Sequence, residues 1–173
     1  MTEESQQQLL APIPAKWRIQ QSGEYGATCV AYIDAREVMD RLDEVFGMGC
    51  WQRDHKEVKG VMYAGIGVYI PSAQDDKWVW KWDCGTESKT EEEKGESSDS
   101  FKRAAVNWGI GRFLYDLPIQ KLKTKMFDKN QKYYPIDNLG NMIWNGEELT
   151  SYLNNLLKLP NGFEDPKEED IRL

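Results

Sequence analysis

The most regular apolar pattern in the chain lies between Asp34 and Gly47. Apolar residues recur there with the i, i+3, i+4, i+7 spacing that places them on one face of a helix. Asp34 is a good N-cap, Glu37 three residues later completes a capping box, and Gly47 is a typical helix end. The pattern predicts an amphipathic helix whose inner face comprises Ala35, Val38, Met39, Leu42, Val45 and Phe46.

Three strand-like segments follow this helix: 51–58, 61–70 and 77–85, the last two separated by the turn-like sequence PSAQDD. In the third segment, Trp78, Trp80 and Trp82 alternate with smaller or charged residues, so the three rings share one face. Such a stripe can stack nucleic-acid bases, but it more often forms the buried face of a sheet beneath a helix. We therefore expect the three rings in the core.

A second helix is predicted to start near Ser98 or Asp99, with Phe101, Ala104, Ala105 and Trp108 on its inner face. Gly109 and Gly111 then indicate a packing turn that ends or kinks the helix. After Pro118 we expect a lysine-rich connector, a hairpin turning at 128–131, and a helix over 147–158. The inward residues of that last helix are expected to be Leu149, Leu153, Leu156 and Leu157.

This order predicts an α+β fold: a helix, a three-stranded antiparallel meander and a long helix, with a small C-terminal hairpin and helix as an appendix. The length of 173 residues suits one domain, here assigned to 1–160, followed by an acidic tail at 161–173. We see no internal repeat. No run of about 20 apolar residues is present, so no membrane span is expected.

The numbers and spacing of cysteine and histidine residues bear on which disulfides and metal sites the chain can form. Three scattered cysteines and one histidine, His55, provide neither a disulfide framework nor the spacing of a zinc site. The acidic, polar N-terminal residues do not resemble a secretory signal. These features favour a reducing cytoplasm and give no reason to expect a metal or another cofactor.

Charge is unevenly distributed along the chain, whose net charge is −7. Acidic residues dominate 87–99 and the last eleven residues, whereas 102–132 carries eight cations against two acids. A local basic stripe of this kind can bind a phosphate backbone even in an acidic protein. The stripe contains Lys102, Arg103, Arg112, Lys121, Lys123 and Lys125.

Two features of the sequence resemble enzyme sites. Gly109 and Gly111 do not form a dinucleotide fingerprint, because Leu114 occupies the third glycine position and a helix precedes the turn. Asp76, Glu87 and Lys89 mimic a magnesium-dependent nuclease site, although charge runs of this type are usually solvated surface. We expect no catalytic residue, and a nuclease or a non-DNA adaptor module remains the alternative.

Two longer blocks carry a family resemblance. SDSFKRAAVNWGIGRFLYDLP at 98–118 resembles the signature helix of the Rad52, Sak and DdrA superfamily of single-strand annealing proteins. VAYIDAREVMDRLDEVFG at 30–47, followed by Trp51, resembles the first helix of that superfamily. The two blocks occur in the family's order, and the resemblance covers roughly 17–118.

The resemblance implies ATP-independent binding of single-stranded DNA and annealing of complementary strands by a ring or helical arc of subunits, with DNA in a basic groove. It also implies a phage-type recombinase in bacterial cytoplasm, with a host single-strand binding protein as a possible partner. Val106 stands where some relatives have a further cation, so Arg112 or one of the lysines at 121, 123 and 125 could supply that contact; Arg112 could equally be structural. The groove residues that match the family are Lys102, Arg103, Tyr32, Lys94 and Arg18.

Overall fold

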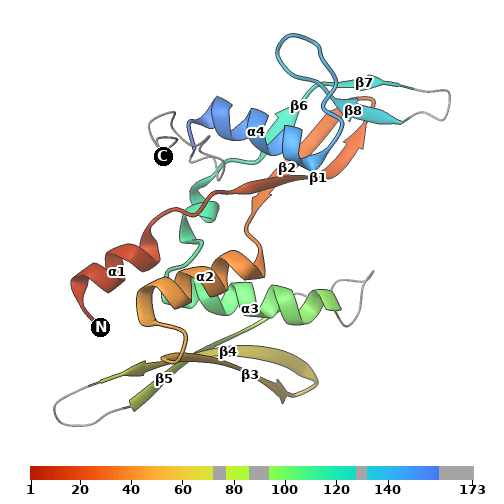
Figure 1. The fold of residues 1–173 in the computed structure, drawn as a ribbon. Coiled ribbons are helices and arrows are strands. Elements are labelled where there is room, and N and C mark those ends of the chain that lie inside the picture. Colours follow the sequence, from red (N-terminus) through yellow and green to blue (C-terminus); the bar gives the residue numbers. More distant parts are fainter. Residues whose placement is uncertain (72–76, 86–93, 128–131, 160–173) are drawn as a thin grey trace, which may run out of the picture. The chain divides into compact units, whose positions relative to one another are not determined.

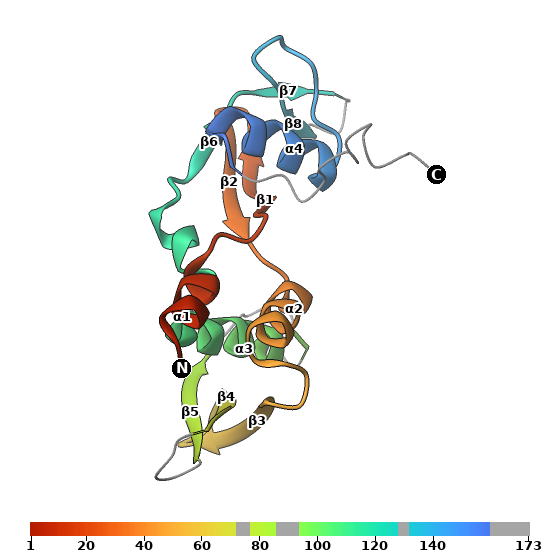
Figure 2. The same cartoon turned by 60° about the vertical axis from the view of Figure 1, so that its left-hand side comes forward.

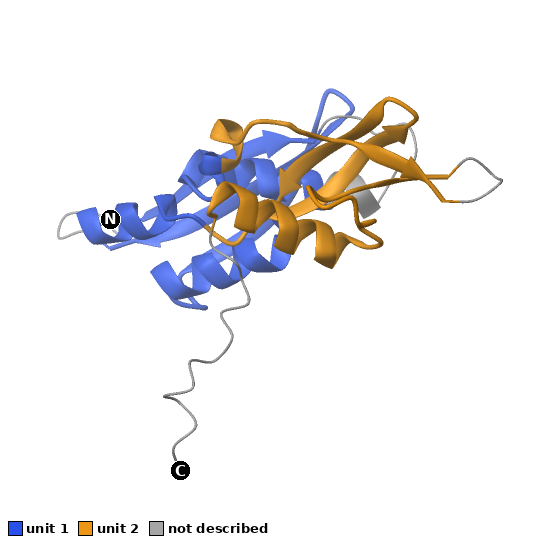
Figure 3. Ribbon diagram, turned by 90° about the horizontal axis from the view of Figure 1, so that it is seen from above, with its two compact units in different colours: residues 1–12, 33–113 blue, residues 13–32, 114–173 orange. Residues whose placement is uncertain are grey.

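The computed structural model describes residues 1–71, 77–85, 94–127 and 132–159 (Figure 1). The chain forms two compact units: unit 1 comprises 1–12 and 33–113, and unit 2 comprises 13–32 and 114–173 (Figure 3). Both combine helices with antiparallel strands, which confirms the predicted α+β class. The acidic tail lies outside the described residues, and the boundaries assigned to a 1–160 domain stay a prediction.

Unit 1 contains the predicted helix and meander. Its elements are α1 (Glu3–Leu10), α2 (Ala35–Phe46), β3 (Trp51–Val58), β4 (Val61–Ile70), β5 (Lys77–Cys84) and α3 (Lys94–Trp108). The three strands pair in sequence order and antiparallel. α2 and α3 lie on the same side of this sheet (Figures 1 and 2). α3 begins at Lys94, about one turn before the predicted start, because its first residues lack the apolar spacing that marks a helix.

The ends of α2 follow their sequence signals. The Asp34 N–H donates to Glu37 Oε2 at 2.6 Å, and Gly47 ends the helix with φ of 85°. Arg41 donates to the backbone oxygens of Gln8 and Ala11, which holds the C-terminal end of α1 against α2. α1 itself was not predicted.

The core of unit 1 lies between α3 and the sheet. Phe101, Ala104, Ala105 and Trp108 are buried, as their spacing predicted. They pack on the sheet face that carries Ala64, Ile66 and Val68, and the Trp108 indole N–H donates to the Ile66 carbonyl at 3.1 Å. None of the described helices is long and apolar enough to cross a membrane.

The expectation for the tryptophan stripe was wrong. Register pairs Trp82 with Gly65 and Trp80 with Gly67, so the rings lie on the sheet face opposite α3. The Trp80 and Trp82 rings stack on each other, Lys56 Nζ lies 3.7 Å from the Trp82 ring centroid, and Trp78 is 40% exposed. Alternation of side chains distinguishes the two faces of a strand but does not show which face a helix covers. Here α3 covers the face that carries Lys81 and Asp83, and it supplies a partner for each charge: the Asn107 carbonyl for Lys81 and Arg103 for Asp83.

Unit 2 is built on a second sheet, in the order β1 (Lys16–Gly23), β2 (Gly26–Tyr32) and β6 (Gln120–Leu122). A hairpin of β7 (Thr124–Met126) and β8 (Tyr133–Pro135) and helix α4 (Gly146–Leu157) complete it. The predicted C-terminal hairpin and helix are thus confirmed, while the turn at 128–131 lies outside the described residues. β1, β2 and β6 were not predicted, and Leu156, expected inward, is 48% exposed.

The core of unit 2 centres on Trp17, which is almost fully buried. The Trp17 indole N–H donates to Asn154 Oδ1 at 2.8 Å, and the Asn154 amide donates to the Ala15 carbonyl at 2.9 Å. This pairing satisfies the polar groups that α4 and β1 bury together, since an unpaired buried donor is costly. The surrounding apolar cluster is completed by Ala27, Cys29, Ile143, Leu149 and Leu153.

Candidate nucleic-acid interface

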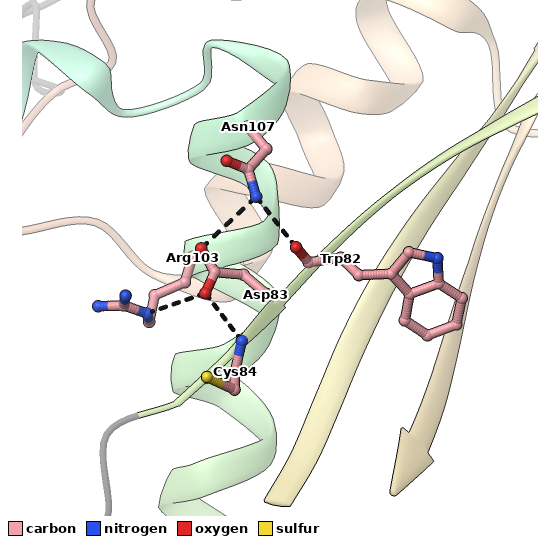
Figure 4. A network of polar contacts seen from close by, with 5 residues as sticks. All are labelled: Trp82, Asp83, Cys84, Arg103 and Asn107. Carbon is pink, nitrogen blue, oxygen red and sulfur yellow. Dashed lines mark hydrogen bonds and ion pairs between the residues drawn. The ribbon is translucent and has the colours of Figure 1, made fainter. Parts of the chain in front are cut away.

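Lys102 and Arg103 lie on the outer part of α3, where the sequence placed them. Both are half-buried, because the edge of α3 runs along β5. Arg103 Nε lies 3.5 Å from Asp83 Oδ1, while the two terminal nitrogens of the guanidinium point away from Asp83 (Figure 4). Arg103 Nε is itself buried and has no hydrogen-bond acceptor within the described residues. Asp83 therefore orients the Arg103 side chain through Nε, and the two terminal nitrogens of the guanidinium stay available on the side away from Asp83.

Asp83 is held in place by several donors. Its carboxylate accepts a hydrogen bond from the Cys84 N–H at 2.8 Å and one from the Asn107 amide at 3.5 Å. The same amide donates to the Trp82 carbonyl at 3.2 Å (Figure 4). A fixed carboxylate beside Arg103 fixes the arginine's direction but also offsets part of its charge toward an incoming anion.

The C-terminal end of α3 is closed by the glycine turn. Gly109 has φ of 107°, its N–H donates to the Val106 carbonyl, and the Ile110 N–H donates to the Ala105 carbonyl. This is a Schellman motif, in which the first residue after the helix has positive φ and is usually glycine. The prediction that this turn ends the helix is confirmed.

Two cations also bind this helix end. Arg112 Nε donates to the Val106 carbonyl at 3.0 Å, and Lys81 Nζ donates to the Asn107 carbonyl at 2.6 Å while lying 4.4 Å from the Trp108 ring centroid. Burial, and then the positive charge of Arg112, lower the pKa of Lys81. Both side chains complement the negative end of the helix dipole. Arg112 is thus engaged with the backbone, and Lys81 is a cation beside α3 that the sequence did not single out.

Arg53 and His55 lie on the helix-covered face of β3. The Arg53 guanidinium carbon lies 4.5 Å from the Phe101 ring centroid, and Arg53 Nε lies 3.3 Å from His55 Nε2. Burial and the charge of Arg53 lower the pKa of His55, against an opposite effect of Asp54. A lowered pKa favours the neutral imidazole, so His55 adds little positive charge near α3 at neutral pH.

Three further candidates, Arg18, Tyr32 and Lys121, lie on one sheet face of unit 2. β1 pairs Arg18 with Val30, and β6 pairs Lys121 with Thr28. Thr28, Val30 and Tyr32 alternate with the buried Ala27 and Cys29 along β2, so they lie on the face away from the core. Arg18, Tyr32 and Lys121 therefore share that outer face, which also receives Lys16, the partner of Tyr32 in the register. The sequence did not single out Lys16.

The other candidates are less closely grouped. Lys123 is exposed between β6 and β7, and Lys125 is exposed on β7. Lys94 is the first residue of α3, but its side chain lies outside the described residues. The nuclease candidates Asp76, Glu87 and Lys89 also lie outside them. Within the described ranges, no group of three or more His, Cys, Asp or Glu side chains could hold a metal ion.

The family comparison connects this geometry to known proteins. Residues 2–133 match the Rad52/22 family of double-strand break repair proteins. The chain belongs to this family. The match extends on both sides of the 17–118 resemblance and includes α1, the whole of unit 1, and the sheet of unit 2.

The chain is similar in sequence to two curated proteins named single-stranded DNA-binding protein DdrA. The one from Deinococcus deserti is 36% identical over 124 residues, which cover 66% of this chain and 58% of the relative. The one from Deinococcus radiodurans is 34% identical over 122 residues, covering 66% and 56%. The chain thus spans less than two thirds of the length of either relative.

Proposed function

We propose that this Rad52/22-family protein binds single-stranded DNA and anneals complementary strands without ATP. Lys102 and Arg103 on α3 are the principal phosphate contacts. Arg18, Tyr32, Lys94, Lys121 and Lys123 contribute further contacts, and Arg112 acts mainly by capping α3. The protein serves as a binding and annealing factor in recombination and repair rather than as an enzyme.

The observation that carries this proposal is the orientation of Arg103. Its guanidinium is held at Nε beside Asp83, and its two terminal nitrogens point away from that carboxylate (Figure 4). Lys102 precedes it on the same helix and is likewise half-buried. Oriented cations on a helix surface bind phosphate oxygens and release counterions, and they require no base reading. The DdrA relatives, named for single-stranded DNA binding, support the same ligand for this chain.

Annealing follows from such a contact without further chemistry. A surface that holds only phosphates leaves base edges free to test pairing with a second strand. The free energy of base pairing then drives the reaction, so neither a nucleotide nor a catalytic side chain is needed. We further propose that the protein acts as a homo-oligomeric ring or helical arc in bacterial cytoplasm, where a host single-strand binding protein could deliver DNA.

The test is salt-dependent binding of a fluorescent oligothymidylate, measured by anisotropy. Lys102→Gln/Arg103→Gln removes two charges and keeps two long polar side chains. If both contact phosphates, the slope of log K against log salt becomes shallower by about 1.4, at about 0.7 for each contact with a single strand. The double variant should also bind more weakly at low salt.

The matched control removes two exposed cations elsewhere. Lys56→Gln acts on the sheet face opposite α3, and Lys158→Gly acts at a left-handed position, φ of 54°, that glycine accepts. This pair should leave the slope nearly unchanged. Equal slopes for wild type and the Lys102/Arg103 variant would reject α3 as the binding surface.

A further inference from the structure

Unit 2 gathers three aromatic rings at the β7–β8 hairpin, outside the groove residues considered so far. Phe127 follows β7, Tyr134 lies on β8, and Trp144 precedes α4 (Figure 1). The Trp144 ring centroid lies 4.9 Å from that of Phe127 and 5.1 Å from that of Tyr134. The Phe127 and Tyr134 centroids are 6.2 Å apart. We call these three residues the aromatic triad.

Two of the three rings are exposed, and the third, Tyr134, is half-buried. Phe127 is 58% exposed and Trp144 is 49% exposed. The Phe127 ring lies nearly perpendicular to both others, at 89° and 88°. Clustered exposed apolar surface marks binding sites more often than scattered single residues do.

Backbone hydrogen bonds fix the positions from which the rings project. The Phe127 N–H donates to the Lys132 carbonyl at 3.0 Å, and the Trp144 N–H donates to Glu148 Oε2 at 2.8 Å. Thr124 Oγ1 donates to the Gly23 carbonyl at 2.6 Å, which ties the hairpin to β1. A ligand therefore meets a largely preformed surface and loses less free energy in ordering it.

Lysines alternate with the rings on the same hairpin face. Register pairs Lys125 with Tyr134, and the Phe127 hydrogen bond places Lys132 opposite Phe127. Residues two apart along a strand share a face, so Lys125, Phe127, Lys132 and Tyr134 lie on one side of the hairpin. Among the described residues, Glu148 contacts Trp144, and its carboxylate accepts hydrogen bonds from the Trp144 N–H and the Asn145 amide.

Exposed rings interleaved with lysines suit a ligand that has both flat faces and negative charge. Unpaired bases stack on aromatic rings without sequence preference while their phosphates attract cations. A duplex buries its base faces and could use only the lysines. We propose that the aromatic triad stacks unpaired bases of single-stranded DNA, with Lys125 contacting an adjacent phosphate. This inference rests on the proposed function and adds a base contact to the phosphate contacts of α3.

The test compares two strands with the same number of phosphates, both about 30 nucleotides long: an oligothymidylate and an abasic strand. Fluorescence anisotropy at physiological salt gives both affinities for the wild-type protein. Stacking predicts about tenfold or greater preference for the strand with bases. This comparison needs no variant, so a folding defect cannot obscure it.

Variants then locate the preference. Phe127→Leu/Trp144→Leu should reduce the ratio of the two affinities to about one and change abasic binding by less than about twofold. Leu139→Ser, at an 87% exposed loop position of the same unit, is the control and should retain the ratio. Lys102→Gln/Arg103→Gln should weaken both affinities while the ratio persists.

The outcomes separate the two proposals. Wild-type protein that binds both strands equally and with strong salt dependence overturns the stacking inference and supports the phosphate contacts alone. A preference that survives in Phe127→Leu/Trp144→Leu also overturns it, because the stacking surface would then lie elsewhere. Wild-type protein that binds neither strand overturns the proposed function itself.

Discussion

Asp83 has two opposite effects on Arg103: it orients the side chain, and it neutralises part of the charge that would bind a phosphate. Asp83 orients Arg103 at 3.5 Å, and the same carboxylate competes with a phosphate for its charge. Because the Arg103 side chain is 39% exposed, solvent screens this pair and it contributes little to stability, less than about 1 kcal/mol. The arrangement therefore affects orientation and DNA affinity more than the free energy of unfolding.

Asp83→Asn tests that balance. The amide can still accept the Cys84 N–H but no longer neutralises Arg103. We predict about two- to fivefold tighter binding of oligothymidylate at low salt, which corresponds to a partly exposed ion pair. Anisotropy measures the change, and in an Arg103→Gln background the gain should disappear. Weaker binding by Asp83→Asn would mean that the carboxylate is needed to hold Arg103 in its binding geometry.

Close packing of the tryptophan rings on the glycines of β4 predicts that a side chain at Gly65 lowers stability. A Cβ at Gly65 would lie 2.6 Å from the Trp82 ring, too close for any side chain. Gly65→Ala should therefore displace Trp82 and lower the free energy of unfolding by about 1–3 kcal/mol. Urea denaturation followed by circular dichroism measures this.

Gly49→Ala is the matched control, since a Cβ there would meet nothing within 4 Å. It should leave stability nearly unchanged. If Gly65→Ala unfolds at the same urea concentration as Gly49→Ala, the close packing of Trp82 on β4 is not a source of stability.

At the scale of elements, local signals determined what could be predicted. α2 has apolar spacing, an N-cap and a terminal glycine, and its predicted and observed bounds coincide. β3 and β4 likewise match their predicted ranges, since alternation and turns bound them. α1 has few apolar residues, and β6 is three residues long, so neither carries a periodic signal.

The β1–β2 hairpin also carries a local signal in the sequence. Ala27, Cys29 and Ala31 alternate with Thr28, Val30 and Tyr32, and Gly23 and Gly26 flank the turn. That alternation would also have grouped Tyr32 with the outer face. The position of Lys121 opposite Thr28 was beyond reach, because β6 pairs with β2 through contacts between residues distant in sequence.

The site shows the same limits. The spacing of Phe101, Ala104, Ala105 and Trp108 correctly placed Lys102 and Arg103 outward. It could not show that Asp83 faces Arg103 or that Lys81 caps α3, since both depend on which face of β5 the helix covers. The sequence suggested that α3 would cover the tryptophan face of β5, because large apolar side chains are usually buried. Charged side chains can also lie under a helix when the helix supplies their partners, as Lys81 and Asp83 do here.

For the whole molecule, the distribution of charge matters more than its sum. The chain carries −7 overall, but several of its described cations lie along α3, on the outer face of the β1–β2–β6 sheet and on the β7–β8 hairpin. An acidic protein can thus bind a polyanion through local surfaces. Membership in the Rad52/22 family agrees with this distribution, and the 2–133 match includes most of these cations.

The central claim is annealing that depends on α3 and on no cofactor. The direct measurement follows two complementary fluorescent oligonucleotides mixed with the protein in EDTA and without any nucleotide. We predict that wild type and Lys56→Gln/Lys158→Gly accelerate annealing equally, whereas Lys102→Gln/Arg103→Gln is slower by about tenfold or more at moderate salt. Annealing by the Lys102/Arg103 variant at the wild-type rate, or wild-type protein that only degrades the strands once Mg²⁺ is added, would contradict the account.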